Sequence, residues 1–199
     1  MLHSNSLKTC AVLIAAIAVT GCGSAPVVVS NSGTPAAAPA SAGQQGDLKL
    51  KAPDGWQSER PTSSMRVSQY QLPAAEGDSE AGSLVVYYFG PGQGGSTNAN
   101  IERWIGQMQQ PGGTPSKDSA TQTQTVNGLK VTLLDVSGTY TGGDMAGGAG
   151  QAKPNFRMRA AVIDTPRGAY FIKLVGPKKT IDRWDQGFQE FIKSAEFKG

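Results

Sequence analysis

Residues 120–140 read ATQTQTVNGLKVTLLDVSGTY, and this stretch decides the fold. Two β-rich runs, 120–126 and 129–140, flank the dipeptide Asn127-Gly128. Asn-Gly tolerates the positive φ angles of a type I′ turn, which joins two antiparallel strands through only two residues. The stretch therefore predicts a β-hairpin and, with it, an antiparallel sheet.

Further strand signals lie on both sides of this hairpin. Downstream, residues 156–164 and 169–175 flank the turn Thr165-Pro166-Arg167-Gly168 and predict a second hairpin. Upstream, residues 64–72 alternate apolar and polar side chains, which is typical of a half-buried strand. Residues 83–89 (SLVVYYF) are the most β-rich run in the chain, so we expect a central strand that is covered on both faces.

Two amphipathic helices are expected to pack on this sheet. Apolar residues recur every three or four positions from Ile101 to Met108, one of residues 97–98 can cap the helix start, and Pro111 ends it. A second apolar stripe predicts a closing helix over residues 178–194. Strand hairpins with packed helices make an α+β fold.

Several segments carry a family resemblance. They are Tyr87-Tyr-Phe-Gly90, Asn100-Ile-Glu-Arg-Trp104, Phe171-Ile-Lys-Leu-Val-Gly-Pro177 and Phe188-Gln-Glu-Phe-Ile-Lys-Ser194. Together with the path of the chain, they resemble the PsbP-like fold, which includes DcrB-type and LpqN-type bacterial lipoproteins. More narrowly, these segments resemble predicted lipoproteins of unknown function with this fold. The resemblance implies an antiparallel β-sheet flanked by helices, an α/β/α sandwich. It transfers no catalytic residue, and its namesake, an extrinsic photosystem subunit, implies a binding or assembly role.

The first 21 residues are expected to be a lipoprotein signal peptide. Lys8 precedes an unbroken apolar run at residues 11–19 (AVLIAAIAV), which covers only about half of a ~30 Å hydrocarbon core and is too short to span it. The run ends in Val19-Thr20-Gly21-Cys22, which resembles the lipobox of bacterial lipoproteins. We therefore expect cleavage between Gly21 and Cys22 and lipidation, including palmitate, of the Cys22 thiol.

The mature chain is expected to consist of a tether and one domain. Residues 22–46 comprise the lipidated cysteine and an Ala/Pro/Ser/Gly-rich stretch that cannot bury enough apolar surface to fold. Residues 47–199 form a single domain with an ordinary hydrophobic core. Gly23 stands where an Asp would resemble an inner-membrane retention signal, so the expected location is the cell envelope, on the outer membrane facing the periplasm in a Gram-negative host.

The chemistry available to the mature chain is limited. His3, the only histidine, and Cys10 are lost with the signal peptide, and Cys22 is acylated. This excludes Cys/His zinc sites, Cys nucleophiles and Ser-His-Asp triads. We expect no enzyme activity, no cofactor and no metal site. After loss of Lys8 the chain has 17 basic (18 − 1) and 15 acidic residues, and no nucleic-acid partner is expected in this compartment.

Two groups of residues are candidate contact sites. Gly92, Gly94 and Gly95 precede the first helix and offer backbone N–H groups to an anion, although the segment lacks the lysine of a P-loop and is equally a strand-to-helix connection. Arg157 and Arg159 share one face of a strand, where they contact an anion or simply face solvent.

Two functions remain open from the residues alone. The first is a non-enzymatic, lipid-anchored envelope module that binds a protein partner or assists assembly, held at the membrane by its anchor. The alternative is a small-ligand binding module with a cleft near loops 90–96 and 141–154. The three tryptophans, Trp56, Trp104 and Trp184, are candidates for a stacking platform that binds a sugar or lipid. Two of the three lie on apolar helix stripes, which favours burial instead.

Overall fold

The computed structural model describes residues 47–142 and 151–198. Eight strands form one antiparallel sheet in the order β2-β3-β4-β9-β8-β7-β5, with β6 also paired to β7. Their bounds are β2 Gln57–Glu59, β3 Arg66–Leu72, β4 Gly82–Tyr88, β5 Met108–Gln109, β6 Ser119–Val126, β7 Leu129–Tyr140, β8 Lys153–Thr165 and β9 Gly168–Pro177. A separate pair joins β1 (Leu48–Lys49) to β10 (Glu196–Phe197).

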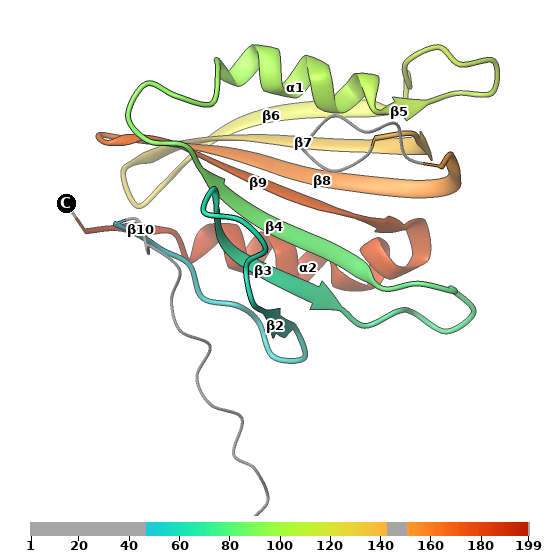
Figure 1. Cartoon of the computed structure of the whole chain (residues 1–199), viewed down its shortest axis with the longest axis horizontal. Helices are drawn as coiled ribbons and strands as arrows, with labels where there is room; N and C mark the ends of the chain where they lie inside the picture. The colour runs from blue at the N-terminus through green and yellow to red at the C-terminus, as the bar shows by residue number, and fades with distance from the viewer. Residues whose placement is uncertain (1–46, 143–150, 199) are drawn as a thin grey trace, which may run out of the picture. The chain divides into compact units, whose positions relative to one another are not determined.

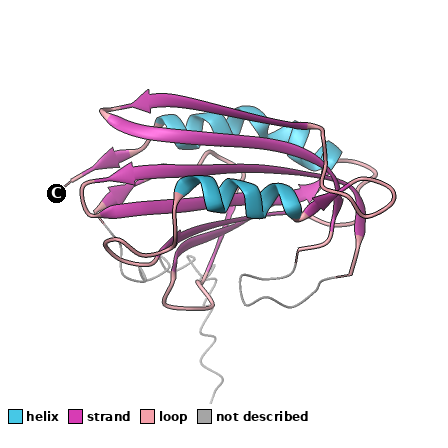
Figure 2. Cartoon of the chain, turned by 90° about the horizontal axis from the view of Figure 1, so that it is seen from above, coloured by secondary structure: helices cyan, strands magenta, loops and turns pink. Residues whose placement is uncertain are grey.

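One helix covers each face of the large sheet (Figure 1). Helix α1 (Thr97–Gly106) lies on one face and helix α2 (Lys178–Lys193) on the other. Seen from above, both helices run along the strands (Figure 2). The structure thus confirms the predicted α+β class, an antiparallel sheet flanked by helices.

The alternation of side chains along each strand builds two cores. In β4, Leu84 and Val86 point to the α2 side, where they meet Phe188, whereas Val85 and Tyr87 point to the α1 side. Residues 84–87 are buried on both faces of the sheet, as predicted for the central strand, and β4 lies between β3 and β9. A strand with neighbours on both sides and a helix on each face must be apolar throughout.

Both predicted hairpins are confirmed. Asn127 and Gly128 have φ angles of 48° and 82°, and Val126 pairs with Leu129, as a type I′ turn requires. The second hairpin joins β8 to β9, and its strands extend beyond the predicted residues 156–164 and 169–175.

The predicted end of the first helix was wrong. Helix α1 stops at Gly106, and Met108 begins β5, which pairs with Tyr140 of β7. Met108 is still buried in the α1-side core, so its apolar side chain was interpreted correctly while its backbone was not. The helix is capped by Ser96, whose hydroxyl accepts a hydrogen bond from Ala99 N at 3.2 Å.

Helix α2 receives its N-terminal cap from a distant loop. Pro177 stands at the N-cap position and contributes no side-chain hydrogen bond. Instead, Asp78 of the β3–β4 loop accepts hydrogen bonds from Thr180 N at 2.8 Å and from Thr180 Oγ1 at 2.7 Å. A carboxylate at this end of a helix satisfies an otherwise unpaired N–H and interacts favourably with the helix dipole.

We expect Asp78→Ala to lower the free energy of unfolding by about 1 kcal/mol, as loss of a helix cap does. Urea unfolding of the full chain measures this as a lower midpoint at unchanged slope. Glu76→Ala is the matched control, because Glu76 is an exposed acid of the same loop. An equal loss in both variants would contradict the capping role.

Candidate functional site

The glycine-rich loop before helix α1 is shaped by packing. Gly92, Gly94 and Gly95 have φ angles of 68°, 87° and 81°. A Cβ on Gly94 would lie 2.4 Å from Phe171 Cε2 and 2.8 Å from Phe89 Cδ2, whereas a Cβ on Gly92 would meet nothing within 4 Å. Gly94 therefore lets the loop lie directly on the core phenylalanines.

Buried Asn100 ties this loop to the helix. Its Nδ2 donates to the carbonyl oxygens of Gly94 at 2.8 Å and Ser96 at 2.9 Å, and its Oδ1 accepts from Arg103. The predicted contact of the three glycines with a ligand or partner stays a prediction. What the geometry provides is a rigid strand-to-helix connection.

The predicted cleft near loops 90–96 and 141–154 stays a prediction. Loop 90–96 leads into the start of helix α1, while Thr141 N donates to Gln107 O at 2.9 Å, beyond the end of the same helix. Ten residues of helix, a length of about 15 Å, lie between the end of loop 90–96 and the hydrogen bond of Thr141. Residues 143–150 of the second loop lie outside the described residues.

Pro154, at the described end of loop 141–154, and its neighbour Asn155 line a groove of about 720 Å³. No residue of loop 90–96 lines this groove. Beside it the β7–β8 pairing is irregular between Gly138 and Tyr140, and Asn155 has a φ angle of 57°. Backbone irregularities of this kind occur often beside binding sites. The lining of the groove includes the polar side chains of Gln109, Gln110, Lys117, Thr139, Asn155 and Lys178.

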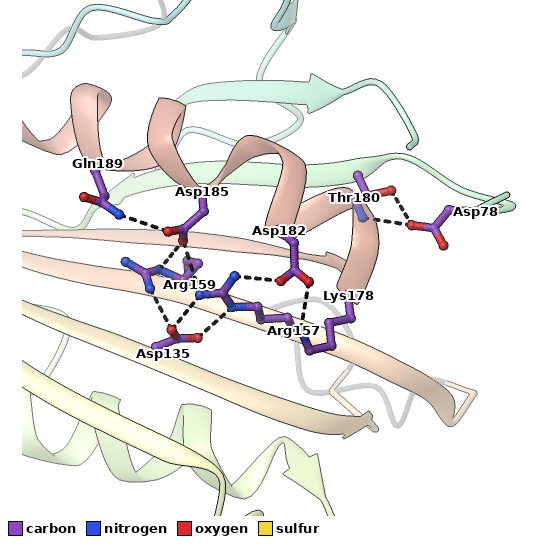
Figure 3. Close-up of polar contacts among 9 residues, drawn as sticks. All are labelled: Asp78, Asp135, Arg157, Arg159, Lys178, Thr180, Asp182, Asp185 and Gln189. Carbon is purple, nitrogen blue, oxygen red and sulfur yellow. Dashed lines mark hydrogen bonds and ion pairs between the residues drawn. The ribbon is translucent and has the colours of Figure 1, made fainter. Parts of the chain in front are cut away.

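Arg157 and Arg159 do share a strand face, and that face lies beneath helix α2 (Figure 3). Arg157 donates to both oxygens of Asp135 in β7, from Nε at 2.9 Å and from Nη2 at 2.7 Å. Arg159 Nη1 donates to Asp135 Oδ2 at 2.7 Å. The two arginine side chains are only 15% and 12% exposed, so they are neither solvated nor free.

Helix α2 closes this cluster from above. Asp182 Oδ1 accepts from Arg157 Nη1 at 2.8 Å, and Asp185 Oδ1 lies 3.3 Å from nitrogens of both arginines. Lys178 donates to Asp182 Oδ2 at 2.7 Å. Three carboxylates and three cations therefore meet between sheet and helix, and their charges balance.

The ion cluster shifts the pKa values of three of its members. Burial alone would raise the pKa of Asp135, but the hydrogen bond from Arg157 and the charges of Arg159 and Arg157 outweigh it and lower the pKa. The pKa of Asp182 is likewise lowered against the effect of burial, by Lys178 and Arg157. The pKa of Arg157 is raised, chiefly by its hydrogen bond to Asp135.

This geometry explains the arginines as a link between sheet and helix. A contact of Arg157 and Arg159 with a ligand or partner stays a prediction, and such a contact would have to compete with carboxylates of the same chain. Sequence reasoning missed Asp135. The alternation of side chains along β7 could have revealed it, because Asp135 falls on the same face as Val131 and Leu133, towards α2.

The tryptophans do not form one platform. Trp104 is 1% exposed in the α1-side core, while Trp56 and Trp184 are half-buried against the α2-side core. The sheet separates Trp104 from the other two. Burial was the better interpretation.

A different feature, the outer edge of strand β6, is uncovered. Strand β6 pairs with β7 over all eight residues without a register shift, and among the described residues no strand pairs with its other edge. Residues 119–125 are all exposed, and β6 contains no charged residue, proline or glycine. Natural sheets usually protect a long edge with charges, proline, a bulge or a cover.

The opposite edge of the sheet is protected in that usual way. It is formed by β2, which has only three residues and includes Glu59. The contrast between a short charged edge and a long uncharged one marks β6 as the edge that is able to accept another strand. Sequence reasoning identified this strand but treated it only as half of a hairpin.

A second groove runs beside β6 on the α2 side. Its volume is about 260 Å³, and it lies between Gln122 and Gln124 of β6 and residues of helix α2. The helix side of the groove is lined by Phe188, Gln189, Ile192 and Lys193. A strand added to β6 would place its side chains along the mouth of this groove.

No known family model and no curated protein sequence matches the chain. Similar solved structures include LpqN, involved in cell envelope biogenesis of Mycobacterium tuberculosis (12% identity, TM-score 0.49, covering 76% of this chain and 83% of that one). They also include PA94, a protein of unknown function from Pseudomonas aeruginosa (14%, 0.44, 76% and 98%), and PsbP from Synechocystis sp. PCC 6803 (11%, 0.45, 76% and 87%). These neighbours agree with the PsbP-like resemblance of the sequence, and the likeness concerns the fold alone.

Proposed function

We propose that this chain is a non-enzymatic, lipid-anchored protein of the bacterial cell envelope that binds a protein strand at the outer edge of β6. The observation that carries the proposal is the eight-residue, uncharged and exposed edge of β6. Strand addition gives affinity through main-chain hydrogen bonds, and the neighbouring side chains give specificity.

The anchoring part of the proposal rests on Cys22. The thiol follows an apolar run and a small residue, as lipoprotein processing requires, and at least two acyl chains on one residue anchor a protein stably. Within residues 47–142 and 151–198, neither helix has the length and apolarity that crossing a bilayer requires. Labelling with radioactive palmitate tests the anchor, and undiminished label in Cys22→Ala would contradict it.

The binding part is tested by a photo-crosslinking amino acid placed at Thr125 of β6 in living cells. We expect a crosslinked protein band of defined mass that is absent when the same group replaces Ser58 of β2, an exposed residue of the opposite edge. Introducing Thr123→Pro into the Thr125 probe should remove the band, and Thr123→Val should retain it. A band that is insensitive to Thr123→Pro would contradict binding at this edge.

The groove of about 720 Å³ supports a second candidate, a small-ligand binding module. The observation that favours it is the backbone irregularity at Gly138 and Asn155 beside polar side chains. A ligand at 100 times its Kd would stabilise the protein by about 2.7 kcal/mol, which a thermal-shift screen of metabolites detects. A ligand that still raises the melting temperature of the double variant Asn155→Ala, Lys178→Ala would bind outside this groove.

A further inference from the structure

Strand β6 presents the main-chain groups of alternate residues to its open edge. Because Val126 and Leu129 close a two-residue hairpin, they form a hydrogen-bonded pair, and every second residue back from Val126 also bonds to β7. The carbonyl of Asp118, which accepts from Ser137 N at 3.1 Å, follows this alternation. The outward N–H and C=O groups therefore belong to the four residues between, Ser119, Thr121, Thr123 and Thr125.

We propose that the strand bound at this edge is β6 of a second copy of the chain, paired antiparallel about a two-fold axis at Gln122. This inference rests on the proposed function and names its partner. In this register Ser119 meets Thr125 of the second copy, and Thr121 meets Thr123. All four outward residues of each copy then exchange both of their main-chain hydrogen bonds.

The side chains of β6 suit pairing with themselves. A two-fold axis brings each charge near an identical charge, and like charges directly opposite one another destabilise a strand pair. Residues 119–126 carry no charge, so this cost does not arise within the strand pair itself. Hydroxyl side chains meet hydroxyl side chains on the α1 side of the sheet, and Thr–Thr pairs are favourable across strands.

The other side of the sheet is equally compatible. Gln122 and Gln124 lie on the α2 side at the mouth of the 260 Å³ groove. On the axis, Gln122 faces Gln122 of the second copy, and each amide offers both a donor and an acceptor. Gln189 and Lys193 of helix α2 line the same groove and provide further polar partners.

Membrane confinement would favour this association. A single strand pair is a small interface, and small interfaces are reversible. Copies anchored to one membrane surface are held at high local concentration, which strengthens a weak contact without new interactions. The inference is therefore tested in membranes with the full, processed chain.

The experiment introduces one cysteine at a time into β6 and crosslinks the variants under mild oxidation. The unaltered chain is the control, because it shows any crosslinking through Cys10 or Cys22. In the proposed register the Cβ atoms of residue 122 approach to ~5 Å, near disulfide distance, whereas two residues 125 lie ~20 Å apart. We expect Gln122→Cys to give a dimer of twice the chain mass and Thr125→Cys to give little. Equal crosslinking at both positions, or none at 122, would overturn the proposal.

A second variant separates this inference from the proposed function. Thr123→Pro removes an outward N–H while leaving the β6–β7 ladder intact, because proline is tolerated at an edge whose N–H faces solvent. It should abolish the Gln122→Cys dimer, and Thr123→Val should keep it. If Gln122→Cys gives no dimer while the photo-crosslink from Thr125 to another protein persists, the second copy is excluded and strand binding at the edge stands.

Discussion

Gly94→Ala is expected to lower the free energy of unfolding by about 3 kcal/mol. A φ angle of 87° strains any residue with a Cβ, and the added methyl would lie 2.4 Å from Phe171 Cε2, which cannot move because Phe171 is fully buried. Backbone strain and overpacking each cost roughly 1–3 kcal/mol. Thermal unfolding should therefore shift down by roughly 6–12 °C, at about 2–4 °C per kcal/mol for a domain of this size.

Gly92→Ala is the matched control for that variant. Gly92 also has a positive φ angle, 68°, but its Cβ would point into open space. It carries the strain without the clash, so we expect a loss of only about 1 kcal/mol. A Gly92→Ala variant that loses as much stability as Gly94→Ala would contradict the packing role of Gly94.

The second large effect is expected at the ion cluster under helix α2. Asp135→Asn keeps the size of the side chain and removes the charge that pairs with Arg157 and Arg159. Leaving one partner of a buried pair unbalanced costs 3–5 kcal/mol, and because Asp135 is one-third exposed we expect about 2 kcal/mol. Urea unfolding at neutral pH measures the loss.

The same carboxylate predicts a pH dependence. The pKa of Asp135 is lowered in the folded protein, so its protonation is easier in the unfolded chain, whose Asp titrates near ~3.9. Its contribution to stability is therefore present above about pH 4 and is lost as the pH falls through the lower, folded pKa. The Asp135→Asn variant should show a weaker loss of stability in acid than the unaltered chain.

Asp164→Asn is the matched control for the urea unfolding of Asp135→Asn. Asp164 lies in the neighbouring strand and approaches Lys130 only to 3.8 Å, with both side chains well exposed. Exposed pairs of this kind contribute little, so we expect near-unchanged stability. If Asp164→Asn were as destabilising as Asp135→Asn, the loss of stability could not be assigned to the ion cluster under helix α2.

The features that could be predicted from the sequence are those coded locally. Asn127-Gly128 specifies a turn by its own backbone preferences, and the alternation on either side follows from one buried face. Residues 83–89 are apolar on both faces, which only a covered central strand explains. The apolar stripe of the closing helix is also a local pattern, and the predicted range 178–194 differs from the observed helix by one residue at its end.

The features that could not be predicted depend on distant partners. Met108 continues a helical stripe, yet its backbone pairs with Tyr140, 32 residues away, and that pairing ends helix α1. Asp135 follows the apolar side chains of Val131 and Leu133 on the α2 side of β7, and its role appears only when Arg157 and helix α2 are brought beside it. The open edge of β6 is a property of sheet order, which no local pattern of Thr and Gln reveals.

Amide hydrogen exchange of the processed chain in its native membranes tests the central claim most directly, namely that another strand covers the edge of β6. In an uncovered edge the amides of Thr121, Thr123 and Thr125 face water, whereas those of Gln122 and Gln124 bond to β7. We predict slow exchange at all five residues in the membrane, and fast exchange at Thr121 and Thr125 in Thr123→Pro. Fast exchange at the three threonines beside protected glutamines in the unaltered chain would contradict the account.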